Sequence, residues 1–227
     1  MYRKYIKRLL DFILSLIAII ILSPILLIVA ILVRIKLGSP VIFKQKRPGL
    51  HERIFTLYKF RTMTDQKDEQ GNLLPDEIRL TKFGKLLRST SLDELPELFN
   101  ILKGDMAIVG PRPQLVRDMV FMTNNQRKRH SVRQGLTGLA QVNGRNNITW
   151  EEKINYDLQY IDKITFINDC KIILNTILKV FKREDISTNG METAEDLGDY
   201  LLKNQNINLI DYQIKQKEAL QILKGEK

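Results

Sequence analysis

Residues 91–100 read Ser-Leu-Asp-Glu-Leu-Pro-Glu-Leu-Phe-Asn, and the rest of the chain can be interpreted outward from this stretch. Pro96 fits best in the first turn of a helix, where its missing N–H costs nothing. The predicted helix has one apolar face, made of Leu95, Leu98, Phe99 and Leu102. Asp93 and Glu94 stand at its N-terminus, where unpaired N–H groups and the helix dipole also favour a bound phosphate. Taken alone, Ser91-x-x-Glu94 is better explained as a capping box.

A second informative stretch is the apolar run from Phe12 to Val33, which contains no charged residue. At about 1.5 Å rise per residue it is long enough to cross a bilayer core. Ser23-Pro24 lies in the middle of the run and predicts a kink, because proline removes a helical hydrogen bond. The Ser23 hydroxyl is the candidate partner for a backbone carbonyl freed at the break.

Both flanks of this run are basic. The cations before it are Arg3, Lys4, Lys7 and Arg8, and those after it are Arg34, Lys36, Lys44, Lys46 and Arg47. The positive-inside rule would keep both ends of the helix in the cytoplasm. A helix broken at Ser23-Pro24 can enter the membrane and return, so a re-entrant helix and a spanning helix are both open interpretations.

Residues 40–61 predict a β-hairpin. Two β-rich runs, 41–43 and 54–58, flank a loop that contains a Pro-Gly pair. Lys59 and Arg61 follow the second run and place two cations where the chain leaves the sheet. The polar residues 64–77 then predict a surface loop, with a lid as one interpretation.

Two amphipathic helices are predicted further along the chain. In the first, an apolar face of Leu80, Phe83, Leu86 and Leu87 alternates with Arg79, Lys82, Lys85 and Arg88. The second has a stripe made of Phe166, Cys170, Ile173, Ile177 and Phe181. Apolar faces bordered by Lys and Arg suit an anionic membrane surface. Packing against the protein's own core explains each of them equally well.

Arg112 lies between Pro111 and Pro113. The two prolines fix the local backbone and so aim the guanidinium, which suits bidentate phosphate binding. The alternative is a solvated arginine in an ordinary surface turn. The Gly- and Asn-rich residues 135–146 allow close approach of a ligand to the backbone, and Arg145 could meet a second phosphate or a carboxamide there.

The composition narrows the class of partner. Lys and Arg number 36 against 26 Asp and Glu, a net charge of +10, which favours nucleic acid, anionic lipid or phosphorylated substrates. Nucleic acid is disfavoured because the cations are spread among apolar helices without stacking aromatics. The single cysteine, Cys170, excludes an intrachain disulfide and fits a reducing compartment. Only His51 and His130 are present, so acid–base chemistry falls on carboxylates.

These features together resemble the bacterial sugar transferase family, specifically the small monotopic polyprenyl-phosphate phosphoglycosyl transferases of the PglC type. The resemblance covers roughly residues 1–185. It rests on Ser23-Pro24 and on five motifs in the family's order, at residues 58–63, 88–100, 102–106, 109–113 and 135–145. Two positions depart from the pattern. Glu97 stands where glutamine is common, and Leu139 stands where tryptophan is common and could alter a membrane or sugar contact.

The resemblance implies a mainly helical α+β fold in three parts. Residues 1–37 would form the re-entrant membrane helix, and residues 38–186 the catalytic domain, with interfacial helices around a cytoplasmic active site. Residues 187–227 would be a linker and a tail without an assigned role. The implied location is the inner membrane of a bacterium, with the catalytic domain on the cytoplasmic face.

The implied reaction is transfer of a sugar 1-phosphate from a UDP-sugar, expected to be an N-acetylated aminosugar, to a polyprenyl (undecaprenyl) phosphate. UMP would leave, and a covalent phosphosugar–aspartate would form at Asp93. The two acids, Asp93 and Glu94, would hold Mg²⁺, and Glu94 could instead activate the lipid phosphate. Arg112, held by Pro111 and Pro113, would clamp phosphate. Secondary phosphate ligands would be Lys59, Arg61, Arg88 and Arg145.

Two alternatives stay open at this stage. The first is a membrane glycosyltransferase that transfers the sugar alone and releases UDP. The second is a non-catalytic, basic membrane adaptor, for which Asp93→Asn would leave function intact. The sequence does not indicate the oligomeric state.

Overall fold

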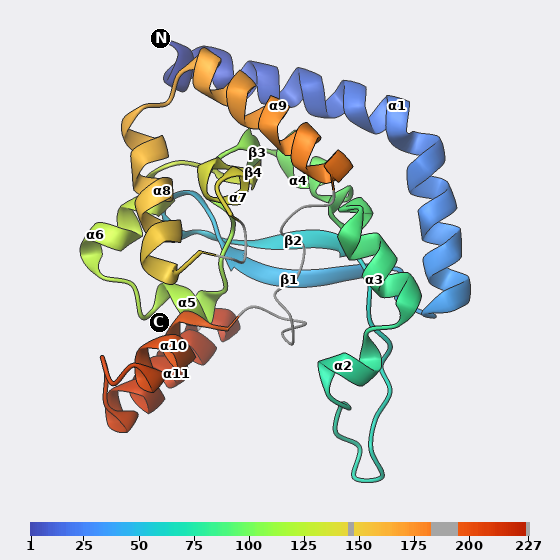
Figure 1. The fold of residues 1–227 in the computed structure, drawn as a ribbon, viewed down its shortest axis with the longest axis vertical. Helices are drawn as coiled ribbons and strands as arrows, with labels where there is room; N and C mark the ends of the chain where they lie inside the picture. Colours follow the sequence, from blue (N-terminus) through green and yellow to red (C-terminus); the bar gives the residue numbers. More distant parts are fainter. Residues whose placement is uncertain (145–147, 183–194, 226–227) are drawn as a thin grey trace.

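The computed structural model describes residues 1–144, 148–182 and 195–225, which form a mainly helical α+β structure with two small sheets (Figure 1). The elements in chain order are η1 (Tyr2–Ile6), α1 (Lys7–Lys36), β1 (Ile42–Pro48), η2 (Leu50–Glu52), β2 (Ile54–Phe60), α2 (Asp76–Arg79), α3 (Lys82–Ser89), η3 (Leu92–Glu94), α4 (Glu97–Lys103), β3 (Met106–Val109), α5 (Val116–Met119), α6 (Asn124–Arg127), η4 (Lys128–Ser131), β4 (Gln134–Thr137), α7 (Leu139–Val142), α8 (Trp150–Asp162), α9 (Phe166–Lys182), α10 (Leu197–Lys203) and α11 (Leu209–Lys224). The predicted class, mainly helical with a small hairpin and a long apolar N-terminal helix, is confirmed at this level.

Helix α1 is bent rather than straight. Figure 1 shows it running along one edge of the molecule and then turning to run down the next edge. Pro24 lies inside the helix and cannot donate to the carbonyl of Ile20, four residues earlier. Ser23 Oγ donates to that carbonyl at 2.8 Å. The predicted role of the Ser23 hydroxyl is therefore confirmed.

Both halves of α1 pack against the same body of the protein. Ala18, Ile19 and Leu22, before the proline, contact the cluster around Leu57 and Ile101. The second half supplies Val29 and Val33 to another cluster, together with residues that include Phe60 and Leu87. A straight helix of this length would carry one of its ends about 45 Å from the other. The bend therefore brings both ends of the apolar helix back to one body.

The predicted hairpin is present, with longer strands than the sequence indicates. β1 and β2 pair antiparallel from Ile42–Phe60 to Pro48–Ile54. The polar residues beyond β2 extend away from the body (Figure 1), and the bridges Met63–Leu80 and Lys67–Leu73 close this excursion. A lid function for it stays a prediction.

A second sheet was not predicted. β3 and β4 form a parallel pair in which Met106 lies opposite Gln134 and Val109 opposite Thr137. Four-residue strands without alternation give little periodic signal in the sequence. This pair aligns the loop after β3, which carries Arg112, with the chain that follows Arg133.

Helix α4 buries only part of the predicted apolar face. Leu98 and Ile101 are buried with Glu97 and Asn100, whereas Phe99 is 42% exposed. Leu98 and Ile101 pack against Leu57 of β2, and this contact decides which face turns inward. Phe99 is therefore part of the outer surface and not of the core.

The two predicted amphipathic helices differ in what their apolar faces contact. In α3, Leu87 is buried and packs in the cluster that includes Phe60 and Val33, so this helix lies on the core. In α9, the buried positions include Asp169 and Ile172, while Phe166 and Ile177 of the predicted stripe are exposed. The stripe of α9 therefore fits the interfacial interpretation.

The C-terminal segment folds onto the body, which the sequence does not indicate. Leu197 of α10 and Ala219 of α11 are buried in a core cluster with α5, the residues that follow it and α8. Trp150 Nε1 donates to Glu195 O at 3.1 Å, and Lys215 Nζ donates to Val120 O at 2.7 Å. The tail is thus an integral part of this side of the molecule.

Candidate active site

The acid pair lies in a tight corner between α3 and α4. Ser91 has a left-handed backbone (φ 54°), after which η3 carries Asp93 and Glu94. The predicted capping box is wrong, because the Ser91 side chain caps no backbone N–H. The carboxylate of Glu94 instead turns away from the helix toward two cations.

These cations converge on Glu94 from two other parts of the chain. Glu94 Oε1 accepts hydrogen bonds from Lys59 Nζ at 2.7 Å and from Arg112 Nη2 at 2.6 Å. Lys59 Nζ also lies 3.1 Å from Glu97 Oε1, an ion-pair distance without hydrogen-bond alignment. We call Asp93, Glu94, Glu97, Lys59 and Arg112 the charged cluster.

The hairpin directs Lys59 into the charged cluster. Alternate side chains of a strand point to the same face, so Lys59 and Leu57 share one face of β2. Leu57 is buried against Leu98 and Ile101 of α4. The apolar contact of Leu57 thus carries Lys59 to the N-terminal end of α4, where Glu97 begins the helix.

Asn100 fixes α4 to the strand, a role that no sequence pattern indicates. Its amide Oδ1 accepts from Tyr58 N at 3.1 Å, and its Nδ2 donates to Thr56 O at 2.7 Å. Asn100 is completely buried. The side chain therefore makes the hydrogen bonds that a neighbouring strand would make along this edge of β2. These bonds fix the position of α4 along the strand, next to Lys59.

Two arginines brace the backbone around Arg112. Arg129 Nη2 donates to Arg112 O at 2.6 Å, and Arg47 Nη1 donates to Pro113 O at 3.1 Å. Arg129 is fully buried and pairs with Asp157 at 2.7 Å. The sequence does not predict this inward orientation of Arg129, because the basic residues 126–133 carry no apolar period.

Asp93 is buried, and its Oδ1 has no hydrogen-bond partner. Burial, and next the charge of Glu94, raise its pKa to about 6, although Lys59, Arg88 and Arg112 oppose the shift. A carboxylate with an unsatisfied oxygen and little hydration is a reactive group. It is ionised above about pH 6 and open to a further partner.

Glu94 has the opposite electrostatic character. Burial alone would raise its pKa, but the charges and hydrogen bonds of Arg112 and Lys59 outweigh burial and hold the pKa well below its usual range. The charge of Glu94 in turn raises the pKa of Arg112. For Glu97 burial dominates over the charge of Lys59 and raises the pKa to about 7. The cluster thus combines one fixed anion with two carboxyls that titrate near neutral pH.

Not all of the other residues predicted for the phosphate site lie near the charged cluster. Arg88 lies close enough for its charge to act on Asp93, and its Nε donates to Thr62 Oγ1 at 3.1 Å. Arg61 is not brought to the charged cluster: it is buried and bonds to Met63 O, Ser39 O and Asp65. Pro111 and Pro113 are buried beside Arg112. Arg145 lies outside the described residues.

The fit to Mg²⁺ can be judged from the donors. No group of three or more His, Cys, Asp or Glu side chains suited to a metal occurs among the residues that the structure describes. Magnesium is commonly held by one or two carboxylates, with substrate phosphates and water completing its shell. One carboxylate oxygen of Asp93 could fill one such position and leave the other oxygen free. Glu94 Oε2, which accepts neither the Lys59 nor the Arg112 hydrogen bond, could fill a second.

The charged cluster lies beside the membrane-type helix. Leu92 and Leu95, on either side of the acid pair, pack against the cluster that contains Val29 and Val33 of α1. The segment Tyr2–Lys36 has the length and apolar composition of a membrane-crossing helix, unlike any other helix in the described part of the chain. The acid pair therefore stands next to the most apolar element in the described part of the chain.

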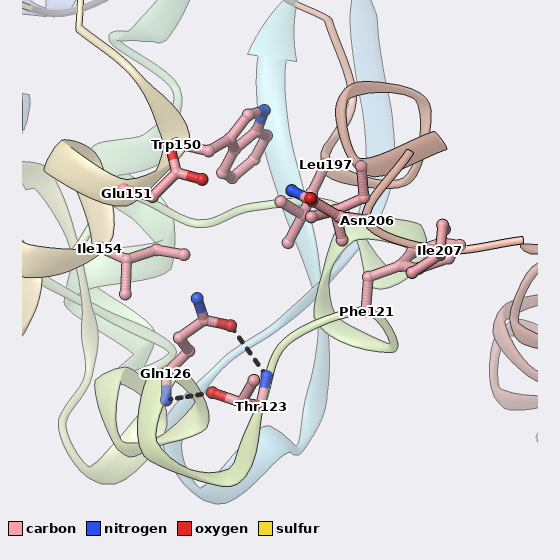
Figure 2. Close-up of a pocket in the computed structure, with 10 residues that line it drawn as sticks. Phe121, Thr123, Gln126, Trp150, Glu151, Ile154, Leu197, Asn206 and Ile207 are labelled. Atoms are coloured by element: carbon pink, nitrogen blue, oxygen red, sulfur yellow. Dashed lines mark hydrogen bonds between the residues drawn. The ribbon is translucent and has the colours of Figure 1, made fainter. Parts of the chain in front are cut away.

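A separate cavity of about 220 Å³ lies elsewhere, between α8 and the C-terminal helices (Figure 2). Figure 2 shows Trp150 and Ile154 on one side of it and Leu197 and Ile207 on the other. None of the residues of the charged cluster lines this cavity. It belongs to the junction with the tail and not to the acid pair.

Residues 2–183 match the family model described as bacterial sugar transferase. The chain is 52% identical over 190 residues to the uncharacterized sugar transferase EpsL of Bacillus subtilis, covering 84% of this chain and 94% of that protein.

Two longer relatives have names that state an activity. The UDP-glucose:undecaprenyl-phosphate glucose-1-phosphate transferase of Klebsiella pneumoniae is 43% identical over 77% of this chain and 40% of its own length. The undecaprenyl-phosphate galactose phosphotransferase of Salmonella typhimurium is 33% identical over 80% of this chain and 41% of its own length. The chain thus spans about two fifths of the length of these two relatives.

Proposed function

The chain belongs to the bacterial sugar transferase family, and on this premise we propose that it transfers a sugar 1-phosphate from a UDP-sugar to undecaprenyl phosphate. The names of the longer relatives support this reaction class. The observation that carries the mechanism is the buried Asp93 oxygen without a hydrogen-bond partner, in a carboxyl group on which the charges of Lys59 and Arg112 act. The product that leaves would be UMP.

In the proposed first step, an ionised Asp93 oxygen attacks the phosphorus that bears the sugar. The bond from this phosphorus to the bridging oxygen breaks, and UMP leaves with the electron pair. The sugar phosphate is then an acyl phosphate on Asp93. Attack by one anion on another requires that nearby positive charge reduce their repulsion, and Arg112 and Lys59 supply that charge at fixed positions.

In the proposed second step, an oxygen of the lipid phosphate attacks the same phosphorus. The bond to Asp93 breaks and the carboxylate is restored, so the enzyme returns to its starting state with polyprenyl diphosphate–sugar as product. Arg112 retains its hold on phosphate in both steps, because its backbone is braced by Arg129 and Arg47. Arg88 and Lys59 are the proposed secondary phosphate ligands.

We propose Asp93 and Glu94 as the ligands of Mg²⁺. Bound Mg²⁺ would neutralise charge on the diphosphate oxygens. The tight bonds of Glu94 to Lys59 and Arg112 keep it ionised, which suits a metal ligand better than a nucleophile. This division of labour assigns the attack to Asp93 alone.

The proposed topology is a re-entrant helix with the catalytic body on the cytoplasmic face of the membrane. The support is the bend at Pro24 and the packing of both halves of α1 on one body. Leu92 and Leu95 place the acid pair next to α1. An undecaprenyl phosphate, whose phosphate lies at the membrane surface, would then present it to Asp93 directly.

The sugar is proposed at two levels. The reaction class requires a UDP-hexose, for which the relatives' names give glucose and galactose. The likeness to PglC-type enzymes favours an N-acetylated aminosugar for this chain. A panel of UDP-glucose, UDP-galactose and UDP-N-acetylated aminosugars separates the two, and turnover with the first two alone would overturn the aminosugar.

The decisive experiment is incubation of the purified chain with the UDP-sugar panel and Mg²⁺ without lipid acceptor. We expect one equivalent of UMP per enzyme and a mass gain of one sugar phosphate on the peptide that contains Asp93. Asp93→Asn should give neither signal. Release of UDP would identify a glycosyltransferase, and an unimpaired Asp93→Asn variant would identify an adaptor; either result contradicts the proposal.

A further inference from the structure

A basic cavity lies at the opposite end of α4 from the charged cluster. Its volume is about 130 Å³. Its cationic lining residues are Arg3, Lys4, Lys7, Arg8 and Arg133. Asp93, Glu94, Glu97, Lys59 and Arg112 do not line it. The seven residues of α4 separate the two sites by about 10 Å along the helix axis.

Positive charge is in excess at this basic cavity. Three carboxylates lie near these cations. Asp169 accepts from Lys7 Nζ at 2.7 Å and from the Tyr2 and Tyr160 hydroxyls. Asp11 Oδ1 accepts from Ile108 N and lies 3.9 Å from Lys7 Nζ, and the charge of Asp105 acts on Arg8. Five cations against these three anions leave a net charge of +2. The cation whose charge these carboxylates neutralise is Lys7, in the inner part of the cavity.

Among the described residues, the outer cations form no ion pair with a carboxylate, although the charges of Asp11 and Asp105 act on Arg8. Arg8 donates to Ile101 O and Leu102 O, and Arg133 Nε donates to Gly104 O, so both guanidinium groups crowd the last turn of α4. Lys4 lies over the ring of Tyr5, and Arg3 has no bond to any described residue. Like charges held together around a cavity favour binding of an anion.

The same region carries the apolar surface that a bilayer would cover. Tyr5 and Leu9 of the N-terminal segment are each more than half exposed, as are Phe166 and Ile167 of α9. The two segments are in contact, because the rings of Tyr2 and Phe166 meet edge to face at 5.8 Å. A cavity with excess positive charge beside exposed apolar side chains matches the headgroup and the acyl chains of one lipid molecule.

We propose that this basic cavity binds the phosphate headgroup of an anionic membrane phospholipid. The ligand is a bilayer lipid and not the lipid acceptor, since the cavity is separated from the charged cluster by α4. Its Arg8 and Arg133 connect the bound phosphate to the last turn of the helix that begins at Glu97. The proposal does not depend on the transfer reaction.

The test is lipid binding by the purified full chain in a neutral detergent, followed by native mass spectrometry. Phosphatidylglycerol and phosphatidylcholine with the same acyl chains are titrated separately. The outer cations are removed in Arg3→Gln/Lys4→Gln, both of which are exposed. The matched control is Arg34→Gln/Lys36→Gln, which removes two exposed cations at the other end of α1.

We expect the parent chain and the control to prefer phosphatidylglycerol by about tenfold, and the Arg3→Gln/Lys4→Gln variant to lose that preference. Arg133→Gln should lose it as well, with its melting temperature measured to establish folding. Equal binding of both lipids by the parent chain, or equal loss in the control, would overturn the proposal.

Two competitors identify the source of the phosphate. Inorganic phosphate at 10-fold molar excess over lipid should not displace phosphatidylglycerol, because it lacks the apolar contacts with α1 and α9. Displacement by inorganic phosphate would reveal a soluble-anion site and contradict the lipid assignment. Displacement by undecaprenyl phosphate at equimolar concentration would assign the cavity to the acceptor lipid, which also overturns it.

Discussion

Asp93 and Glu94 are neighbours in the chain, yet their surroundings shift their pKa values in opposite directions. Glu94 accepts hydrogen bonds from Lys59 and Arg112, whereas Asp93 is buried and its Oδ1 accepts no hydrogen bond. Two carboxyls with separated pKa values can take different roles. The roles proposed above follow from this difference, because the weaker acid retains an oxygen that is free to react.

The raised pKa of Asp93 predicts an acid limb in the UMP burst. Attack needs the carboxylate, so the burst rate should fall as the pH decreases through about 6, the folded-state pKa of Asp93. An ordinary aspartate would stay ionised down to about pH 4. Rapid-quench measurement of UMP between pH 4.5 and 8 checks this expectation. The far-ultraviolet circular dichroism spectrum at each pH is the control for folding. A burst rate that is constant down to pH 5 would contradict the assignment.

At the level of single residues, the sequence predicted well which polar side chains converge. It predicted less well which of them are buried and which groups they bond to. The structure brings Asp93, Glu94, Lys59 and Arg112 together as the motifs indicated. Arg61 was misplaced because a cation at a strand end can turn to either side, and here backbone carbonyls take it. Burial depends on contacts between distant segments, which a local pattern does not encode.

The buried pair Arg129–Asp157 predicts a separation of stability from activity. Arg129→Met leaves the Asp157 carboxylate buried and unpaired, which should lower the free energy of unfolding by about 3 kcal/mol. Arg129→Met/Asp157→Leu should recover most of that stability, because apolar replacement of a buried pair is often neutral. The double variant should still transfer the sugar phosphate about tenfold more slowly than the parent chain, because the hydrogen bond from Arg129 to Arg112 O is lost.

Thermal unfolding and burst rates of both variants test this separation. Asp118, which is buried near the tail and holds the N–H groups of Leu115 and Leu197, offers a control at Asp118→Asn. That variant should lose stability without a comparable loss of burst rate per folded molecule. Full recovery of transfer in the double variant would mean that Arg129 acts only on stability.

At the level of elements, Pro24 and Ser23 together determine the shape of α1. The proline frees the Ile20 carbonyl and the serine hydroxyl satisfies it, so the bend leaves no unpaired acceptor in an apolar surrounding. The sequence predicted this feature because proline chemistry is local. It left re-entrant and spanning arrangements open, since the packing of both halves on one body involves residues as far along the chain as Leu136.

The bend predicts the labelling pattern of cysteines at the two ends of α1. On a Cys170→Ser background, Lys4→Cys and Lys36→Cys should both resist a membrane-impermeant thiol reagent in intact cells and react after permeabilisation. Pro24→Ala restores a backbone hydrogen-bond donor and should straighten the helix. One of the two cysteines should then lie on the outer side of the membrane and react in intact cells. Ile25→Ala, which keeps the proline, should retain the original pattern. Labelling of one site in the parent chain would refute the re-entrant topology.

At the level of the whole molecule, the tail is the part that the sequence described least. Its weak apolar pattern gave no sign that α10 and α11 would complete a core cluster with α5 and α8. Leu197 and Ala219 are buried there, although most of α11 is exposed. An isolated helix with so few apolar contacts has little periodic signal, and only the complementary surface around Phe121 and Trp150 explains its position.

Docking of the tail predicts a protease-sensitive variant. Leu197→Ala removes a buried side chain and should weaken docking by about 2–3 kcal/mol. Tryptic cleavage at Lys203 and Lys215 should then become at least tenfold faster, as followed by mass spectrometry. Leu220→Ala, at a site 58% exposed on α11, should cleave at the parent rate. Equal rates for all three proteins would show that Leu197 does not secure the tail.

Helix α4 has one further consequence, which concerns distance along α1. One end starts at Glu97 in the charged cluster, beside the second half of α1, and the other ends in carbonyls that accept hydrogen bonds from Arg8 near the start of α1. Two turns of rigid helix thus keep the charged cluster about 10 Å from the turn that Arg8 contacts. Under the proposed function, we expect that lengthening α4 by one turn would shift the charged cluster along α1 and slow transfer to undecaprenyl phosphate.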